Sequence, residues 1–151
     1  MKKALSWGAG ALVDGPVDLI LGYNPLKVGI IGLGIEPGID DLRQSLVVQL
    51  VETLSGKGMD VRIYDEYVNL PKRVEGNKAY IERVLPHVFT PMCPSTEQVL
   101  NKSNVIVVAH DPRERRQQLI ELLKPYQLLF DFVKVVSDED DYPGKYEGIC
   151  W

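Results

Sequence analysis

Short apolar runs alternate with amphipathic helical patterns along this chain, and this alternation constrains its fold more than any other feature. Strands are predicted over residues 28–33, 60–65, 104–109 and 127–133. Between the first two runs, apolar side chains recur at helical spacing at Leu42, Leu46, Val47, Leu50, Val51 and Leu54. Strand and helix in alternation predict parallel strands joined by right-handed crossovers. The expected fold class is α/β, a single Rossmann-like, doubly wound parallel sheet with helices on both faces.

Capping residues mark where the helices should begin. The acidic pair at 40–41 supplies N-cap chemistry for the first helix, and Ser95 opens a segment with capping-box spacing. Asp111 is the expected N-cap of a helix that has Pro112 at its first position. A further short helix is predicted over residues 77–85.

The length of 151 residues suits one domain of ordinary size, and it is short for a complete two-substrate enzyme. Residues 1–26 are rich in Gly and Ala without a sustained period, so we expect a loosely attached N-terminal arm. Residues 27–151 form the expected domain. The acidic run at 138–141 is interpreted as a solvated loop.

Composition excludes several classes of function. The net charge of −4 argues against a broad nucleic-acid-binding surface, and no apolar run reaches membrane-spanning length. Cys93 and Cys150 make neither a disulfide framework nor a metal cluster. The first residues lack a convincing signal-peptide cleavage site, so a cytoplasmic protein is expected, with neither a membrane nor a nucleic acid as partner.

A glycine-rich loop follows the first predicted strand. Gly32, Gly34 and Gly38 give the spacing Gly-x-Gly-x-x-x-Gly, one residue longer than the usual dinucleotide pattern. The acidic residue that ends the second strand is Asp65, 31 positions after Gly34 rather than about 20. An NAD-binding interpretation therefore fits poorly, and the loop is either a phosphate-binding element or a structural turn.

Several side chains are expected near the edge of the sheet at which the predicted parallel strands have their carboxyl ends. The roles of these side chains are interpreted as follows from the sequence. Arg43 either contacts phosphate or is a solvated first-turn residue, and Asp41 is interpreted as a cap rather than a catalyst. Asp65 either accepts hydrogen bonds from a ribose or holds a turn. His110 follows a buried strand at the same edge, where a lone histidine is usually structural.

Two further groups are interpreted as non-catalytic. Cys93 has no base or oxyanion element beside it in the sequence, and Cys150 lies next to the last residue, so no catalytic residue is assigned. The segment 113–116, Arg-Glu-Arg-Arg, is interpreted as a solvated helix face, because it contains an acid and lacks aromatic neighbours.

Several motifs together resemble a known family. They are Lys27 to Leu33, the Asp-Asp-Leu-Arg-Gln-Ser element at 40–45, Gly58 to Asp65, Asn77 to Arg83 and the ending Glu147 to Trp151. The chain resembles the C-terminal nucleotide-sugar-binding domain of the UDP-glucose and GDP-mannose 6-dehydrogenases, and the GDP-mannose branch in particular. The resemblance covers about residues 17–151 and is strongest over 27–68.

The resemblance implies a GDP- or UDP-sugar as ligand, held through Gly34, Glu36, Gly38, Asp41, Arg43 and Asp65. A complete enzyme of this family oxidises the sugar C6 alcohol in two NAD-linked steps, through a catalytic cysteine outside this domain, and serves polysaccharide biosynthesis. No cofactor is expected on this domain alone, and no metal. NAD and catalysis would require a separate chain that carries the missing domains.

One departure from the family favours a second hypothesis. The family has Phe-Lys before the Asp-Asp pair, whereas this chain has Ile35-Glu36. A carboxylate near a pyrophosphate repels it and could cost on the order of 1–4 kcal/mol. The alternative is therefore a degenerate interaction or regulatory domain that keeps the fold and has lost the ligand.

Overall fold

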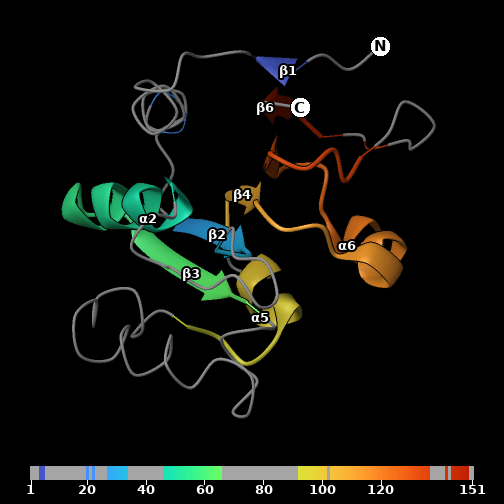
Figure 1. The fold of residues 1–151 in the computed structure, drawn as a ribbon, viewed down its shortest axis with the longest axis horizontal. Helices are drawn as coiled ribbons and strands as arrows, with labels where there is room; N and C mark the ends of the chain where they lie inside the picture. The colour runs from blue at the N-terminus through green and yellow to red at the C-terminus, as the bar shows by residue number, and fades with distance from the viewer. Residues whose placement is uncertain are drawn as a thin grey trace.

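The computed structural model describes residues 4–5, 20, 22, 27–33, 46–65, 92–101, 103–136, 142 and 144–149. Within these residues the chain forms one sheet of six strands, all parallel (Figure 1). The strands are β1 (Ala4–Leu5), β2 (Lys27–Ile31), β3 (Asp60–Tyr64), β4 (Val105–Val108), β5 (Leu128–Asp131) and β6 (Tyr146–Ile149). The helices are α2 (Leu46–Gly56), α5 (Thr96–Leu100) and α6 (Arg116–Leu122), the last preceded by a 3-10 turn, η3 (Arg113–Arg115).

The strand order is β1-β6-β5-β4-β2-β3. From β2 the chain moves outward to β3, and it then returns to the other side of β2 to form β4. The direction of winding therefore reverses between β2 and β4, and their carboxyl ends form a topological switch point. In open α/β sheets, ligands bind in the crevice at such a point.

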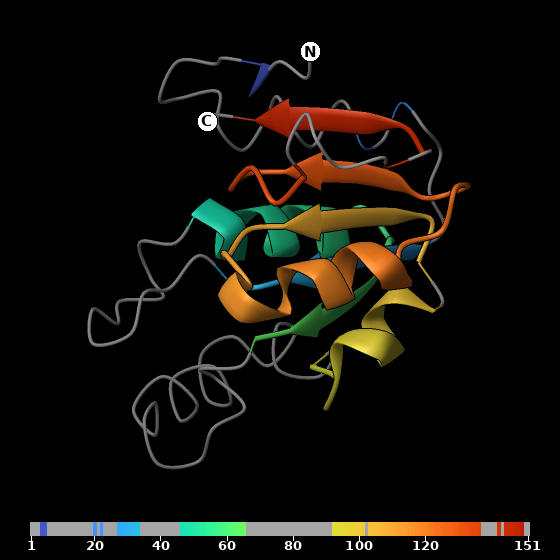
Figure 2. The ribbon, with the colours of Figure 1, turned by 90° about the vertical axis from the view of Figure 1, so that its right-hand side faces the viewer.

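Helix α2 covers one face of the sheet. Figure 2 shows it behind the strands, on the side opposite α6. Its side chains Val47, Leu50, Val51 and Leu54 are at most 8% exposed and pack against Val28 and Ile30 of β2 and Phe130 of β5. Apolar residues at this spacing form one stripe of a helix, which explains why the predicted pattern becomes a buried face.

Helices α5 and α6 cover the other face (Figure 2). Val99 and Leu100 of α5 and Leu119 of α6 pack with Ile106 and Val108 of β4 and Leu129 of β5. Successive strand residues point to opposite faces, so β4 supplies Val105 and Val107 to the first core and Ile106 and Val108 to the second. A strand buried on both faces is apolar throughout, as this one is.

A glycine in β2 allows α5 to approach the sheet closely. A Cβ built on Gly29 would lie 2.6 Å from Ser103 Oγ and 2.7 Å from Val99 Cγ1. Ser103 itself is 1% exposed, and its hydroxyl donates to the carbonyl of Val99 at 2.6 Å. Any larger residue at position 29 would push α5 away from β2.

The four predicted strands are confirmed, within a residue or two at their ends. The predicted cap of α5 is confirmed as well, since Ser95 Oγ accepts a hydrogen bond from Gln98 N at 3.3 Å. The predicted N-cap role of Asp111 for α6 differs from the structure. Asp111 Oδ1 accepts a hydrogen bond from Arg113 N at 2.9 Å, and the 3-10 turn η3 separates Asp111 from α6. The α-helix consequently begins at Arg116 rather than at Pro112.

Two strands are absent from the sequence-based prediction. β6 pairs with β5, and Ala4–Leu5 pair with Gly148 and Ile149 as an edge strand. Within the expected arm, Ile20 is fully buried in the core on the α2 face. The division at residue 26 stays a prediction. The expected helix over 77–85, the start of the first helix at 40–45 and the acidic run 138–141 lie outside the described residues.

Candidate functional site at the switch point

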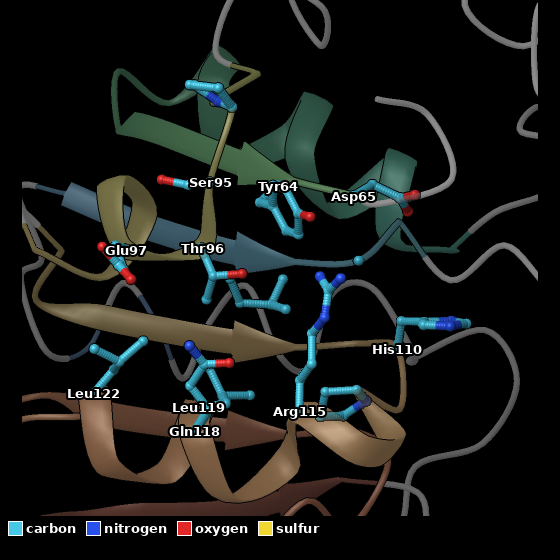
Figure 3. Close-up of a pocket in the computed structure, with 14 residues that line it drawn as sticks. Tyr64, Asp65, Ser95, Thr96, Glu97, His110, Arg115, Gln118, Leu119 and Leu122 are labelled. Carbon is cyan, nitrogen blue, oxygen red and sulfur yellow. The ribbon is translucent and has the colours of Figure 1, made fainter. Parts of the chain in front are cut away.

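A pocket of about 360 Å³ opens at the switch point, on the face covered by α5 and α6. Its walls come from the carboxyl ends of β2 and β3, the start of α5, and the segment that runs from the end of β4 into α6 (Figure 3). Parallel strands present their carboxyl ends at one edge, so residues far apart in sequence meet here. The volume falls within the range of small-molecule sites.

Backbone hydrogen bonds and one carboxylate fix the β2–β3 end of the pocket. Gly32 N donates to Tyr64 O at 2.7 Å, and Leu33 N donates to Asp65 Oδ2 at 2.8 Å. Asp65 is only 2% exposed. Its carboxylate therefore holds Leu33, the last described residue before the glycine loop, and its contact with a ribose stays a prediction.

Gly32 also brings the end of β2 against the end of β4. It has φ +87°, a conformation that suits glycine, and a Cβ at this position would collide with Cβ of His110. His110 lines the pocket and is half-buried. The glycine thus serves two purposes here, a left-handed turn and a close approach of two chain segments.

Arg115 is the cation of the described pocket wall. In Figure 3 its side chain rises from η3 toward Tyr64 and Thr96, with His110 on one side. The sequence predicts a solvated face for 113–116, and the structure adds a pocket position for Arg115, whose side chain is exposed. For Arg116 the prediction is wrong, because its part-buried Nε donates to the carbonyl of Val135.

The rest of the lining mixes polar and apolar groups. Hydroxyl and amide groups come from Tyr64, Ser95, Thr96 and Gln118, and Glu97 supplies a carboxylate. The apolar part consists of Ile31, Pro94, Pro112, Leu119 and Leu122. A few polar groups around an apolar surface are typical of a site for an organic ligand. Among the described residues, no group of three or more His, Cys, Asp or Glu is placed to hold a metal.

Of the six site residues that the sequence predicts, the structure describes one. Asp65 lies in the pocket wall, whereas Gly34, Glu36, Gly38, Asp41 and Arg43 lie outside the described residues. Cys93 forms no disulfide among the described residues and is 7% exposed, and its backbone N–H donates to Ile63 O at 2.7 Å. No helix in the described part of the chain has the length and apolar character needed to cross a membrane.

Sequence reasoning missed Arg115, Tyr64 and Thr96 as pocket residues. A signal existed for Arg115, since it follows the β4 end by a few residues and the switch-point rule places that end at the site. The signal is weak because an arginine in the first turn of a helix is usually solvated. Only the positions of η3 and α5 show that these side chains share one pocket.

Comparison with known proteins agrees with this geometry. Residues 29–138 match the profile described as "UDP-glucose/GDP-mannose dehydrogenase family, UDP binding domain". The chain belongs to this family. The matched residues include the last three residues of β2, all of β3 to β5 and all residues of the pocket wall, so the family assignment covers the site itself.

Curated relatives are similar over nearly the whole chain. GDP-mannose 6-dehydrogenase of Pseudomonas syringae pv. tomato is 34% identical over 166 residues, covering 99% of this chain and 38% of the relative. The enzyme of the same name from Azotobacter vinelandii is 32% identical over 142 residues, covering 93% of this chain and 32% of the relative. The chain thus spans about a third of the length of these proteins.

Solved structures give the same fold. A ternary complex of GDP-mannose dehydrogenase from Pseudomonas aeruginosa matches with a TM-score of 0.75 and 34% identity, covering 92% of this chain and 31% of that one. A UDP-glucose dehydrogenase from Pyrobaculum islandicum matches with a TM-score of 0.64 and 20% identity, covering 94% and 30%. The expected Rossmann-like fold is confirmed.

Proposed function

We propose that this chain binds a GDP- or UDP-sugar and serves as the substrate-nucleotide part of an NAD-dependent nucleotide-sugar 6-dehydrogenase. The observation that carries the proposal is a pocket at the switch point of a sheet that belongs to a UDP-binding-domain family. The proposal includes a role in polysaccharide biosynthesis in the cytoplasm.

The glycine loop is the proposed contact for the phosphates. Its backbone N–H groups, between Gly34 and Gly38, would donate to phosphate oxygens at the start of the following helix, and Arg43 would add a positive charge. Asp41 would cap that helix. The buried Asp65 carboxylate accepts a hydrogen bond from the N–H of Leu33, which directly precedes Gly34.

The described residues do not fit NAD on this domain. An NAD site of the dinucleotide type offers a carboxylate to the ribose at the end of its second strand. Here the corresponding residue, Asp65, is 2% exposed and holds Leu33 N. Oxidation would therefore require NAD-binding and catalytic parts beyond the residues that match this family, for example on a separate chain.

The second candidate is a regulatory or interaction domain that has lost the ligand. Glu36 favours it, because it replaces the lysine that the resemblance leads us to expect next to the pyrophosphate. Calorimetric titration with GDP, UDP, GDP-mannose and UDP-glucose separates the candidates. Saturable micromolar binding of at least one ligand supports the proposal, and the absence of heat with all four supports the alternative.

Replacement of Glu36 by lysine tests the loop directly. If the loop faces phosphate, Glu36→Lys removes a repulsion and adds an attraction, so affinity for GDP should rise about 10-fold or more. The same reversal at Glu52, half-buried on α2 and outside the pocket wall, is the matched control. Equal affinities of the two variants would place the phosphates elsewhere.

A further inference from the structure

We propose that β1 is a removable cover over the outer edge of β6, and that β6 pairs with β6 of a second copy of this chain once β1 leaves. This self-association requires no ligand and lies outside the pocket wall. The direction of the backbone groups of β6 and the charges along the strand specify how the two copies pair.

The strand β1 is the outermost strand on one side of the sheet, next to β6 (Figure 1). It has only two residues, and Ala4 and Leu5 pair with Gly148 and Ile149. Every other pair of neighbouring strands is registered over three to five residues. Since backbone hydrogen bonds hold neighbouring strands together, β1 is the strand that leaves the sheet most easily.

The backbone groups of β6 point alternately toward its two neighbours. Leu129 N donates to Lys145 O at 2.9 Å, so the N–H and C=O groups of Lys145 and Glu147 point toward β5. Those of Tyr146 and Gly148 point the other way, toward β1. When β1 leaves, this edge of β6 therefore presents donors and acceptors that another strand can bind.

The opposite edge of the sheet has a different protection. On β3, Arg62 Nε forms an ion pair with Asp60 Oδ1 at 3.3 Å, and the two side chains are 46% and 43% exposed. Nearer the carboxyl end of β3, Met92 pairs with Ile63, and Cys93 N donates to Ile63 O. Charged side chains and an added chain segment both oppose pairing with another molecule. We therefore expect a second copy at β6 rather than at β3.

Hydrogen-bond direction and charge select one register for the two copies. In antiparallel strands, two residues whose backbone groups face each other exchange both hydrogen bonds. Tyr146 has this direction, so a two-fold axis can pass between Tyr146 and Tyr146 of the second copy. Lys145 of each copy then lies opposite Glu147 of the other. Opposite charges at directly facing positions stabilise a strand pair, and the symmetry provides this contact twice.

Other registers lack this complementarity. An axis at Gly148 would place Glu147 opposite Ile149 and leave the charges unmatched. An axis at Glu147 would bring two carboxylates face to face, although the backbone groups of Glu147 point toward β5. The ring of Tyr146 packs with the core beneath α5 and α6, so Lys145 and Glu147 share the other face of β6.

Leu5→Pro tests the cover in the full chain. The parallel register places the N–H of Leu5 against the carbonyl of Gly148, and proline has no N–H to donate. The dissociation constant of self-association, measured by sedimentation velocity at several concentrations, should fall about 10-fold or more relative to the parent chain. Leu5→Ala keeps the N–H and is the matched control.

Deletion of residues 1–5 should have the same effect as Leu5→Pro, and circular dichroism establishes that each variant keeps its fold. If the parent chain and both variants have equal dissociation constants, β1 does not cover a self-association surface, and the proposal is overturned.

Charge reversal tests the register in the Leu5→Pro variant. Adding Glu147→Lys places a lysine opposite Lys145 of the second copy and should weaken self-association about 10-fold. Adding Lys145→Glu to Glu147→Lys restores opposite charges and should restore tight association. Glu121→Lys, an exposed reversal on α6, is the control and should change nothing. If the double reversal associates as weakly as Glu147→Lys alone, the register is wrong.

Discussion

The backbone conformation of Gly32 and its close contact with His110 help to shape the pocket. Its φ of +87° disfavours any side chain, and a Cβ would also lie 3.0 Å from His110 N and collide with His110 Cβ. Gly32→Ala should lower the free energy of unfolding by about 2–4 kcal/mol, since it combines left-handed strain with a backbone clash. Urea unfolding followed by circular dichroism measures this change.

Gly58 provides the control for that substitution. Its φ is +85°, but nothing lies within 4 Å of the position of a Cβ. Gly58→Ala should therefore cost only the conformational part, about 1–2 kcal/mol. A loss at position 58 equal to that at position 32 would show that the contact with His110 adds nothing.

Tyr142 makes stability depend on alkaline pH. Burial raises its pKa from 10.0 to about 12, and its hydroxyl donates to the carbonyl of Gln127. Between these two values the unfolded chain releases a proton that the folded chain keeps. The contribution of Tyr142 to stability is therefore complete below pH 10 and is lost as the pH rises toward 12.

The Tyr142 effect is measured by urea unfolding at several pH values between about 8 and 11. Tyr142→Phe should reduce the fall in unfolding free energy above pH 10, although it also removes the bond to Gln127 O. Tyr126→Phe is the control, because Tyr126 is 66% exposed. If the fall is as steep in Tyr142→Phe as in the parent chain, the raised pKa is wrong.

Helix α5 shows what local sequence can predict about an element. Its capping segment is read directly from Ser95 to Gln98, and the hydrogen bond from Gln98 N to Ser95 Oγ confirms it. Helix α6 shows the limit. Pro112 has the backbone conformation of a helix start, but Arg113 follows with φ +52°, so the chain makes the turn η3 before the α-helix begins.

Strand β6 was not predictable because tertiary contacts specify it. Tyr146, Glu147, Gly148 and Ile149 show neither an apolar run nor a clear alternation. Tyr146 Oη donates to Asp131 Oδ2 at 2.5 Å, and Asp131 is fully buried. The same carboxylate accepts from Val133 N at 3.1 Å and Val136 N at 3.2 Å, so one buried group joins β5, the following turn and β6.

Removing the Tyr146 hydroxyl should loosen β6. Tyr146→Phe leaves Asp131 with one donor fewer, which should lower the free energy of unfolding by about 1–3 kcal/mol. Amide hydrogens of residues 146–149 should exchange faster with solvent. Tyr126→Phe should change stability by less than about 0.5 kcal/mol, and an equal effect of both substitutions would contradict the role of Asp131.

At the scale of the whole molecule, the chain spans about a third of the length of the relatives that it matches. Its match spans 38% and 32% of two curated relatives, and no catalytic cysteine motif is recognised around Cys93 or Cys150. We expect purified protein to show no NADH absorbance at 340 nm with NAD and GDP-mannose. NADH formation by the purified chain would contradict the proposal that this chain contributes only the substrate-nucleotide part.

The sequence by itself determined the fold class and four strands of the sheet, because apolar periodicity and capping are local properties. It also determined the family, through short motifs that are each contiguous in the sequence. Only the tertiary structure decided the pocket. Strand order brings Gly32, Tyr64, Thr96 and Arg115 together at one switch point, and that order depends on how α2, α5 and α6 bury the two faces of the sheet, which no local window of sequence contains.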